Sequence, residues 1–174
     1  TGVSDNRANQ NYTASAVTFS GSGRVADAGG TCIPGVTLGG LPGDPATDPN
    51  GNYTATVVSG WTGAITPSKD GYSFLPLARN LSDVTSNRTG QDFTGSTLSY
   101  TISGRVSDGG GIALAGVQLG GLPGNPTTDP NGNYSATVSH GWTGTATPTK
   151  TGYSFSPSTR SYTSVGAAQA NQNY

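Results

Sequence analysis

Ser22-Gly23-Arg24-Val25 returns as Ser103-Gly104-Arg105-Val106, and Asp48-Pro49-Asn50-Gly51-Asn52-Tyr53 returns as Asp129-Pro130-Asn131-Gly132-Asn133-Tyr134. Both pairs are offset by 81 residues, and the register holds between them without an insertion or deletion. More than half of the aligned positions are identical. A fixed period of this kind is the signature of an array of like modules. The sequence therefore predicts tandem domains that share one fold.

The segments around these motifs have the pattern of β-strands. In the second copy, residues 100–106 alternate with period two, which places Ile102 and Val106 on the inner side of a strand. Asn131-Gly132 is predicted to form a type I′ hairpin turn. No stretch has apolar residues at a period of 3.6. The spacing of turn residues gives roughly six or seven short strands per copy, which is typical of a small β-sandwich.

The period also sets the domain boundaries. We expect β-sandwich repeat 1 over residues 15–95 and β-sandwich repeat 2 over residues 96–174. Residues 163–174 match residues 1–12, and both end in Ala-Asn-Gln-Asn-Tyr. Residues 1–14 are therefore interpreted as a terminal strand that belongs to a preceding module.

This extra strand has no place of its own in the chain. Residues 3–14 match the last strand of each module, at 84–95 and 165–174, and both modules already contain that strand. An unpaired strand exposes backbone groups that are ready to pair. We therefore expect head-to-tail, open-ended assembly with copies of the chain or with adjacent repeats. The residues assigned to this assembly strand are Val3, Gln10 and Tyr12.

The composition excludes several classes of function. Only 10% of residues are charged and the formal net charge is −1, which leaves no basic patch for nucleic acid. No apolar run is long enough to span a membrane. Cys32 is the single cysteine, so the chain holds no disulfide and no cysteine-based metal site. His140 is the single histidine, and its counterpart is Ser59. No catalytic constellation is present, and we expect neither an enzyme nor a cofactor.

Taken together, the motifs resemble one family. They are Ser-Gly-Arg-Val-x-Asp-x-Gly-Gly, Gly-Val-x-Leu, Thr-Asp-Pro-Asn-Gly-Asn-Tyr, Gly-Trp-Thr-Gly and Gly-Tyr-Ser-Phe-x-Pro. Each copy as a whole resembles the carboxypeptidase regulatory-like domain. That family implies an immunoglobulin-like or transthyretin-like β-sandwich, found as tandem modules in secreted and surface proteins of bacteria. It also implies a non-catalytic structural or spacer role and an extracellular or cell-surface location.

The recurring acidic and basic residues are assigned to structure. Asp48 and Asp129 lie in a loop with a superficial likeness to a calcium loop, but the loop lacks the bidentate Glu and the ligand spacing. An Asp side chain that binds nearby backbone N–H groups explains the motif better, and no bound calcium is expected. Arginines on the outer face of the strands are expected to pair with Asp. They are Arg24, Arg105, Arg79 and Arg160.

Asn-x-Ser/Thr sequons are the remaining signal. Asn52 and Asn133 occupy the same position in both copies, and strand alternation places both on the outer face. The chain carries too few charges to provide much solubility, and covalent glycans would provide it instead. The competing interpretation is that Asn is frequent because it favours turns. The candidate glycosylation sites are Asn11, Asn52, Asn80, Asn87 and Asn133.

Two functions follow from these observations. The first is a structural repeat segment of an extracellular filament, stalk or adhesin shaft, in which short linkers join glycosylated modules. The second is a carbohydrate-binding or accessory spacer module of a secreted enzyme. For the second, Trp61 and Trp142 are the candidates for stacking on a sugar, although burial of both indoles is the favoured expectation.

Overall fold

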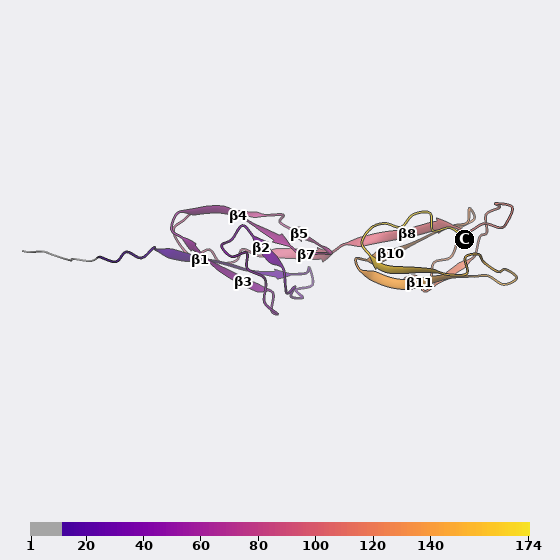
Figure 1. Cartoon of the computed structure of the whole chain (residues 1–174), viewed down its shortest axis with the longest axis horizontal. Coiled ribbons are helices and arrows are strands. Elements are labelled where there is room, and N and C mark those ends of the chain that lie inside the picture. Colours follow the sequence, from indigo (N-terminus) through magenta and orange to yellow (C-terminus); the bar gives the residue numbers. More distant parts are fainter. Residues whose placement is uncertain (1–11) are drawn as a thin grey trace, which may run out of the picture. The chain divides into compact units, whose positions relative to one another are not determined.

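The computed structural model describes residues 12–174, and all regular elements in that range are β-strands (Figure 1). The prediction of an all-β fold is confirmed. The chain separates into two compact units. One comprises residues up to Ser68 together with Phe74–Thr94, and the other comprises Lys69–Ser73 together with Gly95–Tyr174. Across residues 12–174 no helix is long and apolar enough to cross a membrane.

The first copy of the repeat forms two sheets. One has the strand order β3-β1-β7-β5, and the other has the order β2-β4-β6. β1 pairs with β3 in antiparallel register and with β7 in parallel register. The strands are β1 (Thr18–Ala26), β2 (Thr37–Gly39), β3 (Asn52–Val58), β4 (Trp61–Ser68), β5 (Tyr72–Leu75), β6 (Arg79–Val84) and β7 (Phe93–Thr97).

The second copy repeats most of this plan. Its sheets are β10-β8 and β12-β11-β9, and the antiparallel pairing of β8 with β10 corresponds to that of β1 with β3. The strands are β8 (Ser99–Arg105), β9 (Gln118–Gly120), β10 (Asn133–Ser139), β11 (Trp142–Thr149) and β12 (Arg160–Val165). Within the described residues, β5 and β7 are the strands of the first copy without a counterpart here.

Alternating side chains build the core of each repeat. Along β10 every second residue is buried, and the residues between them are exposed. Ile102 and Val106, predicted to point inward, are both 0% exposed. Burial of an aliphatic side chain of this size contributes about 1.5–3 kcal/mol relative to exposure. The largest fully buried side chains of repeat 2 are Ile102, Val106, Val117, Leu119 and Val138.

The turn before β10 differs from its prediction. Gly132 has a φ of 77°, but Asn131 is not among the residues with positive φ, so the type I′ prediction is wrong. β10 also pairs with β8 and not with the preceding strand. The role predicted for the acidic residue is confirmed. Asp129 Oδ1 accepts hydrogen bonds from the backbone N–H groups of Asn131 at 2.9 Å and Asn133 at 2.8 Å.

A buried threonine next to this turn fixes the loop that precedes it. Thr128 is 5% exposed. Its Oγ1 accepts a hydrogen bond from Val117 N at 2.9 Å and donates one to Leu114 O at 2.6 Å. The hydroxyl both accepts and donates a hydrogen bond. Its burial therefore leaves no polar group unpaired and carries no energetic penalty of that kind. Thr47 makes the corresponding bonds in repeat 1.

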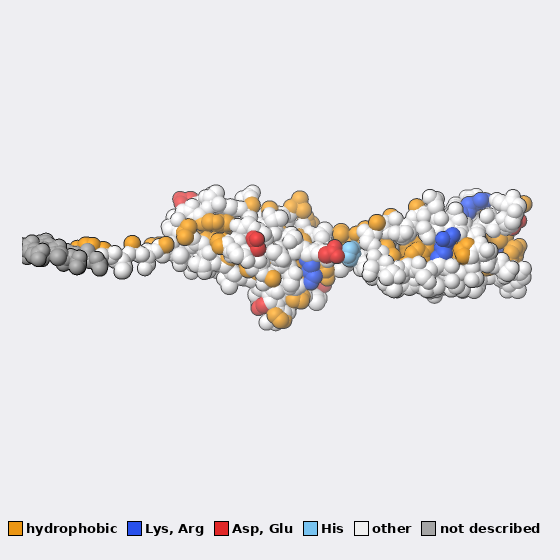
Figure 2. Space-filling view, in the orientation of Figure 1, with side chains coloured by type: hydrophobic (Ala, Val, Ile, Leu, Met, Phe, Trp, Pro, Cys, Tyr) orange, Lys and Arg blue, Asp and Glu red, His pale blue; other side chains and the backbone are white. Residues whose placement is uncertain are grey.

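The arginines bind backbone carbonyls, which corrects the expectation of Asp partners. Arg105 donates to Asn131 O and Gly111 O. Arg24 Nη2 donates to Gly30 O at 2.9 Å and lies 3.0 Å from the sulfur of Cys32. A planar guanidinium group carries several N–H donors, so it can bind carbonyl oxygens of two neighbouring loops at once. An ion pair with one carboxylate would not join the loops in this way. Figure 2 shows isolated charged side chains on a largely uncharged surface in the face drawn.

Candidate functional site

The last segment of each repeat lies parallel to its first strand. In repeat 1, Arg88 N donates to Ser20 O at 2.7 Å, and Ser22 N donates to Arg88 O at 2.8 Å. Phe93 then pairs with Val25 in parallel register. We call this stretch, residues 84–97, the terminal segment of repeat 1. It is held by main-chain bonds along most of the length of β1.

The terminal segment of repeat 2, residues 165–174, is bound in the same way. Gln169 N donates to Thr101 O at 2.8 Å, and Ser103 N donates to Gln169 O at 2.9 Å. Tyr174 N donates to Arg105 O at 3.1 Å. The segment therefore completes the sheet edge beside β8 even though it is not itself a regular strand.

Close approach between the first strand and this segment requires glycine. A Cβ atom on Gly104 would clash with the Gln172 carbonyl group, which is backbone and cannot move aside easily. Gly23 stands in the same relation to Gln91. Sequence reasoning assigned no role to either glycine. Their presence in both Ser-Gly-Arg-Val motifs was the signal that could have identified them.

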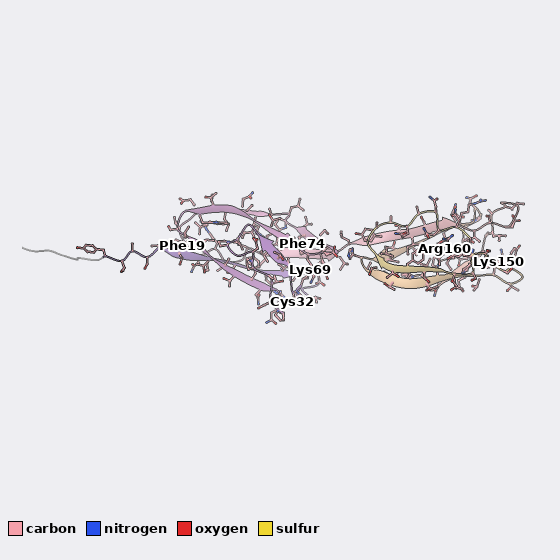
Figure 3. All side chains as sticks on the ribbon, in the orientation of Figure 1. Phe19, Cys32, Lys69, Phe74, Lys150 and Arg160 are labelled. Carbon is pink, nitrogen blue, oxygen red and sulfur yellow. The ribbon has the colours of Figure 1, made fainter. Side chains whose placement is uncertain are left out.

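Aromatic and arginine side chains fix the end of the terminal segment. Tyr174 is 9% exposed, and its ring lies 5.4 Å from the Arg160 guanidinium carbon. Arg160 also donates to Asn173 O, and it is labelled in Figure 3. Burial raises the pKa of Tyr174 to about 12, so its hydroxyl stays protonated at neutral pH. That hydroxyl donates to Ala146 O at 3.3 Å.

The predicted assembly strand lies only partly within the described residues. Val3 and Gln10 lie outside them. Tyr12 is 88% exposed, and residues 12–17 have no strand assignment and are exposed. The assignment of this segment to a preceding module remains a prediction.

The sequons of the described residues lie at the surface. Asn52 and Asn133 are exposed at the first residue of β3 and β10, as strand alternation predicted. Asn80 is exposed on β6, and Asn87 is exposed while its Oδ1 accepts a hydrogen bond from Ser20 N. Asn11 lies outside the described residues. Exposure is necessary for glycan attachment, but use of these sites remains a prediction.

The tryptophans are half-buried, between the two alternatives considered from the sequence. Trp142 packs against the core of repeat 2, and its ring centroid lies 5.9 Å from that of Tyr162. The indole also covers Gly144, where a Cβ atom would clash with the ring. Trp61 covers Gly63 in the same way. Much of each indole therefore serves packing.

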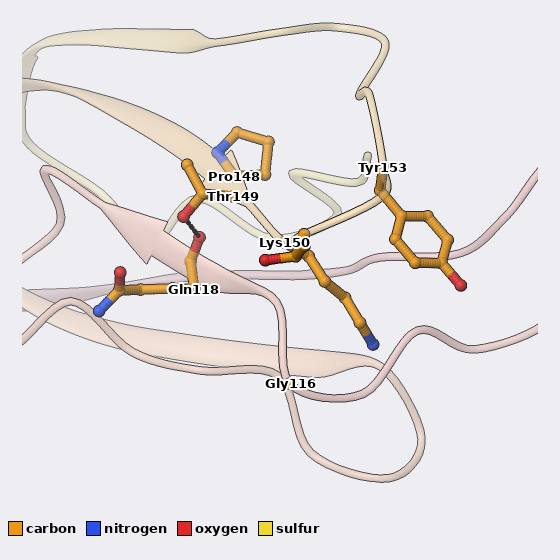
Figure 4. Close-up of a pocket in the computed structure, with 7 residues that line it drawn as sticks. Gly116, Gln118, Pro148, Thr149, Lys150 and Tyr153 are labelled. Carbon is orange, nitrogen blue, oxygen red and sulfur yellow. Dashed lines mark hydrogen bonds between the residues drawn. The ribbon is translucent and has the colours of Figure 1, made fainter.

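A groove of about 620 Å³ lies on repeat 2 beside β9 and β11. Figure 4 shows Lys150 and Tyr153 at one side of it and Gln118 at the other. Lys150 Nζ donates to Ala115 O and lies 5.4 Å from the Tyr153 ring centroid. Within residues 12–174, no cluster of three His, Cys, Asp or Glu residues could hold a metal ion.

A second cleft, of about 370 Å³, lies where the terminal segment of repeat 2 meets the end of β8. Its walls include the counterpart of β5, residues 153–156, which is not a strand in this repeat. The residues that line it include Ser107, Asp108, Leu114, Tyr153, Phe155 and Tyr174.

No family model matches the chain, so its resemblance to the carboxypeptidase regulatory-like domain remains a prediction. The chain is 32% identical over 122 residues to chitinase ChiA of Flavobacterium johnsoniae. The match covers 67% of this chain and 8% of the chitinase. The chain thus spans less than a tenth of that relative.

One solved structure shares the fold of this chain. The Bacillus anthracis TIE protein aligns with a TM-score of 0.68 and 13% identity, over 91% of this chain and 34% of that protein. A streptococcal ancillary pilin aligns with a TM-score of 0.43 and 16% identity, over 90% of this chain and 62% of the pilin. At 13% identity, the likeness to the TIE protein concerns the fold alone. The chain is therefore an all-β protein whose fold is similar to that of a bacterial protein.

Proposed function

We propose that the chain is a structural repeat segment of an extracellular bacterial filament, stalk or adhesin shaft, assembled head to tail and carrying glycans. The observation that carries the proposal is the continuity between repeats. β7 ends at Thr97 and β8 begins at Ser99, so only Leu98 separates the terminal strand of one repeat from the first strand of the next. No flexible tether lies between them.

The surface also suits a structural role. Charge is sparse, and the described residues contain no cluster suited to metal binding. Exposed sequons recur at Asn52 and Asn133, where glycans would cover the outer face of equivalent strands. The bacterial relative supports a bacterial source for the repeat type.

Electron microscopy of the native material tests the proposal. We expect filaments whose axial step is one repeat, and intact-mass measurement should show additional mass on peptides that contain Asn52 and Asn133. Isolated globular particles from the native source would contradict the filament. A mass equal to that of the unmodified polypeptide would contradict glycosylation and leave the filament part of the proposal standing.

The chitinase relative supports a second function, an accessory or carbohydrate-binding module of a secreted enzyme. Chitin pull-down with the wild-type chain tests it, together with Trp61→Ala and Trp142→Ala. Because both indoles also pack within their repeats, each variant needs a circular dichroism check of folding. Binding that the folded variants lose would favour this function over the structural one.

A further inference from the structure

Two strands with equivalent places in the repeats lie at the edge of their sheets. β3 is the outer strand in the order β3-β1-β7-β5, and β10 pairs with β8 alone (Figure 1). Repeat 1 has another repeat after it in the chain and repeat 2 has one before it, yet both strands are edges. The free edge is therefore a property of the repeat itself.

The backbone groups of β10 alternate between β8 and the free side. Gln169 N donates to Thr101 O and Ser103 N donates to Gln169 O, so the odd-numbered residues of β8 bond to the terminal segment. Successive residues of a strand point these groups in opposite directions, so the even-numbered residues of β8 bond to β10. They are paired with even-numbered residues of β10. The N–H and C=O groups of Ser135 and Thr137 therefore point to the free side.

No other strand covers this free side within residues 12–174. The isolated bridges and the loop hydrogen bonds of that range do not involve Ser135 or Thr137, and both residues are exposed. Asn133, at the start of β10, has its backbone groups bound by Asp129. The unpaired part of the edge thus begins after Asn133. Its N–H and C=O groups must bind water or a further strand.

The edge lacks the features that usually prevent such pairing. Edge strands are commonly protected by charged residues, proline, a bulge or short length. β10 is seven residues long, Asn-Tyr-Ser-Ala-Thr-Val-Ser, and its register with β8 is unbroken. β3, Asn-Tyr-Thr-Ala-Thr-Val-Val, has the same properties. By contrast, β2, β5 and β9 have three or four residues, and β6 and β12 include charged residues.

We propose that the free side of β10 pairs with β10 of a second copy of this chain, antiparallel and about a two-fold axis at Ala136. β3 offers the same pairing, centred on Ala55. In this register Ser135 lies opposite Thr137 of the second copy, and the two residues exchange both N–H to C=O hydrogen bonds. The sheet then continues from one copy into the other. This pairing goes beyond head-to-tail assembly, because it uses a sheet edge and neither terminal segment.

The side chains of β10 fit a second copy as the partner. Its exposed side chains are Asn, Ser and Thr, so pairing of the strand with its own copy places no like charges opposite each other. Ser opposite Thr is a favourable pair across two strands. Buried and exposed residues alternate in an order that is the same in both directions along the strand. An antiparallel copy therefore places exposed residues opposite exposed ones, as a self-complementary interface requires.

Sedimentation velocity of the full chain without glycans, over a range of concentrations, tests the pairing. We expect self-association that rises with concentration. Thr56→Lys combined with Thr137→Lys should weaken it at least about tenfold, because lysine on an edge strand opposes pairing. Ala64→Lys combined with Thr145→Lys is the matched control at exposed positions of the central strands β4 and β11. A chain that stays monomeric, or equal weakening by both pairs of substitutions, would overturn the proposal.

A cross-link tests the register without lysine substitutions. Chains with Ser135→Cys are mixed with chains with Thr137→Cys in a glutathione redox buffer, all in a Cys32→Ala background. The counterpart of Cys32 is Ala113, so the fold already accepts this background. Opposite residues of such a pair have Cα atoms about 5.5 Å apart, which a disulfide spans.

We expect at least about tenfold more disulfide-linked heterodimer from this mixture than from Ser135→Cys with Thr145→Cys, because only the first pair lies within disulfide reach. Circular dichroism checks that each variant is folded. Equal yields from the two mixtures would overturn the proposal. Self-association without the link between residues 135 and 137 would assign the edge to a different segment and would also overturn it.

Discussion

The hydroxyl of Tyr134 donates a hydrogen bond to the carbonyl oxygen of Gln172, 2.5 Å away. The bond joins the start of β10, beside the end of β8, to the terminal segment, across 38 positions of sequence. Tyr53 makes the same bond to Gln91 in repeat 1. The motif Asp-Pro-Asn-Gly-Asn-Tyr thus ends in the residue that retains the last strand.

Replacement of Tyr134 by Phe should loosen the terminal segment. The change leaves the Gln172 carbonyl without this donor, and we expect a loss of about 1–2 kcal/mol in the free energy of unfolding. Urea denaturation measures the loss, and hydrogen exchange should show faster exchange at residues 169–174. Tyr153→Phe, at an exposed tyrosine, is the matched control and should leave both quantities unchanged. Unchanged exchange in the Tyr134 variant would show that the bond does not retain the segment.

Alkaline pH should destabilise the fold through its buried tyrosines. Burial raises the pKa of Tyr53 and of Tyr174 to about 12, and it raises that of Tyr134 as well. An unfolded tyrosine ionises near pH 10. Between about pH 10 and pH 12 the unfolded state therefore loses protons that the folded state keeps, and stability falls as the pH rises.

Urea midpoints measured from pH 8 to pH 12 test this dependence. The wild-type midpoint should be constant below about pH 9 and decline above pH 10. Tyr174→Phe should decline less steeply, because one of the groups responsible has been removed. Parallel curves for the two proteins would exclude Tyr174 as a source of the effect.

Gly104→Ala tests the close approach between β8 and the terminal segment. The added methyl group would clash with the Gln172 carbonyl group, and we expect a destabilisation of about 1–3 kcal/mol. Gly109→Ala is the matched control, since a Cβ atom there meets nothing within 4 Å. Thermal unfolding of both variants gives the comparison. A similar melting temperature for the two would mean that the segment moves aside at little cost.

Asp129 is expected to act as an acceptor for backbone N–H groups and not as a calcium ligand. Asp129→Ala removes the acceptor for Asn131 and Asn133 and should cost about 1–2 kcal/mol, as loss of a comparable helix cap does. Asp129→Asn retains a side-chain oxygen and should recover part of that loss. For the wild-type chain, melting temperatures in calcium chloride and in EDTA should agree. A rise with calcium would assign the loop to metal binding.

The period of two along each strand was sufficient to predict the cores. Ile102 and Val106 were expected to point inward, and both are fully buried. Partners across the fold could not be predicted in the same way. The guanidinium group of Arg105 reaches carbonyls of two loops, and the hydroxyl of Thr128 binds Leu114 O and Val117 N, because tertiary structure places those backbone groups there. Local sequence does not encode such distances.

One repeated motif shows a related limit. Gly-Tyr-Ser-Phe occurs in both copies, yet it forms β5 in one and an irregular segment in the other. In the first copy β5 pairs with β7. Strand formation here is a property of the neighbouring strand and not of the four residues themselves.

The parallel pairing of β1 with the terminal segment also has a mechanical consequence. The chain enters repeat 1 at the beginning of β1 and leaves it at the end of β7, and these two strands are bonded neighbours that run in the same direction. Tension applied to the two ends of a repeat pulls the strands past each other along their length. The load is then shared by all the main-chain bonds between β1 and the terminal segment, which are not opened one at a time. Each module of such a chain should therefore resist stretching.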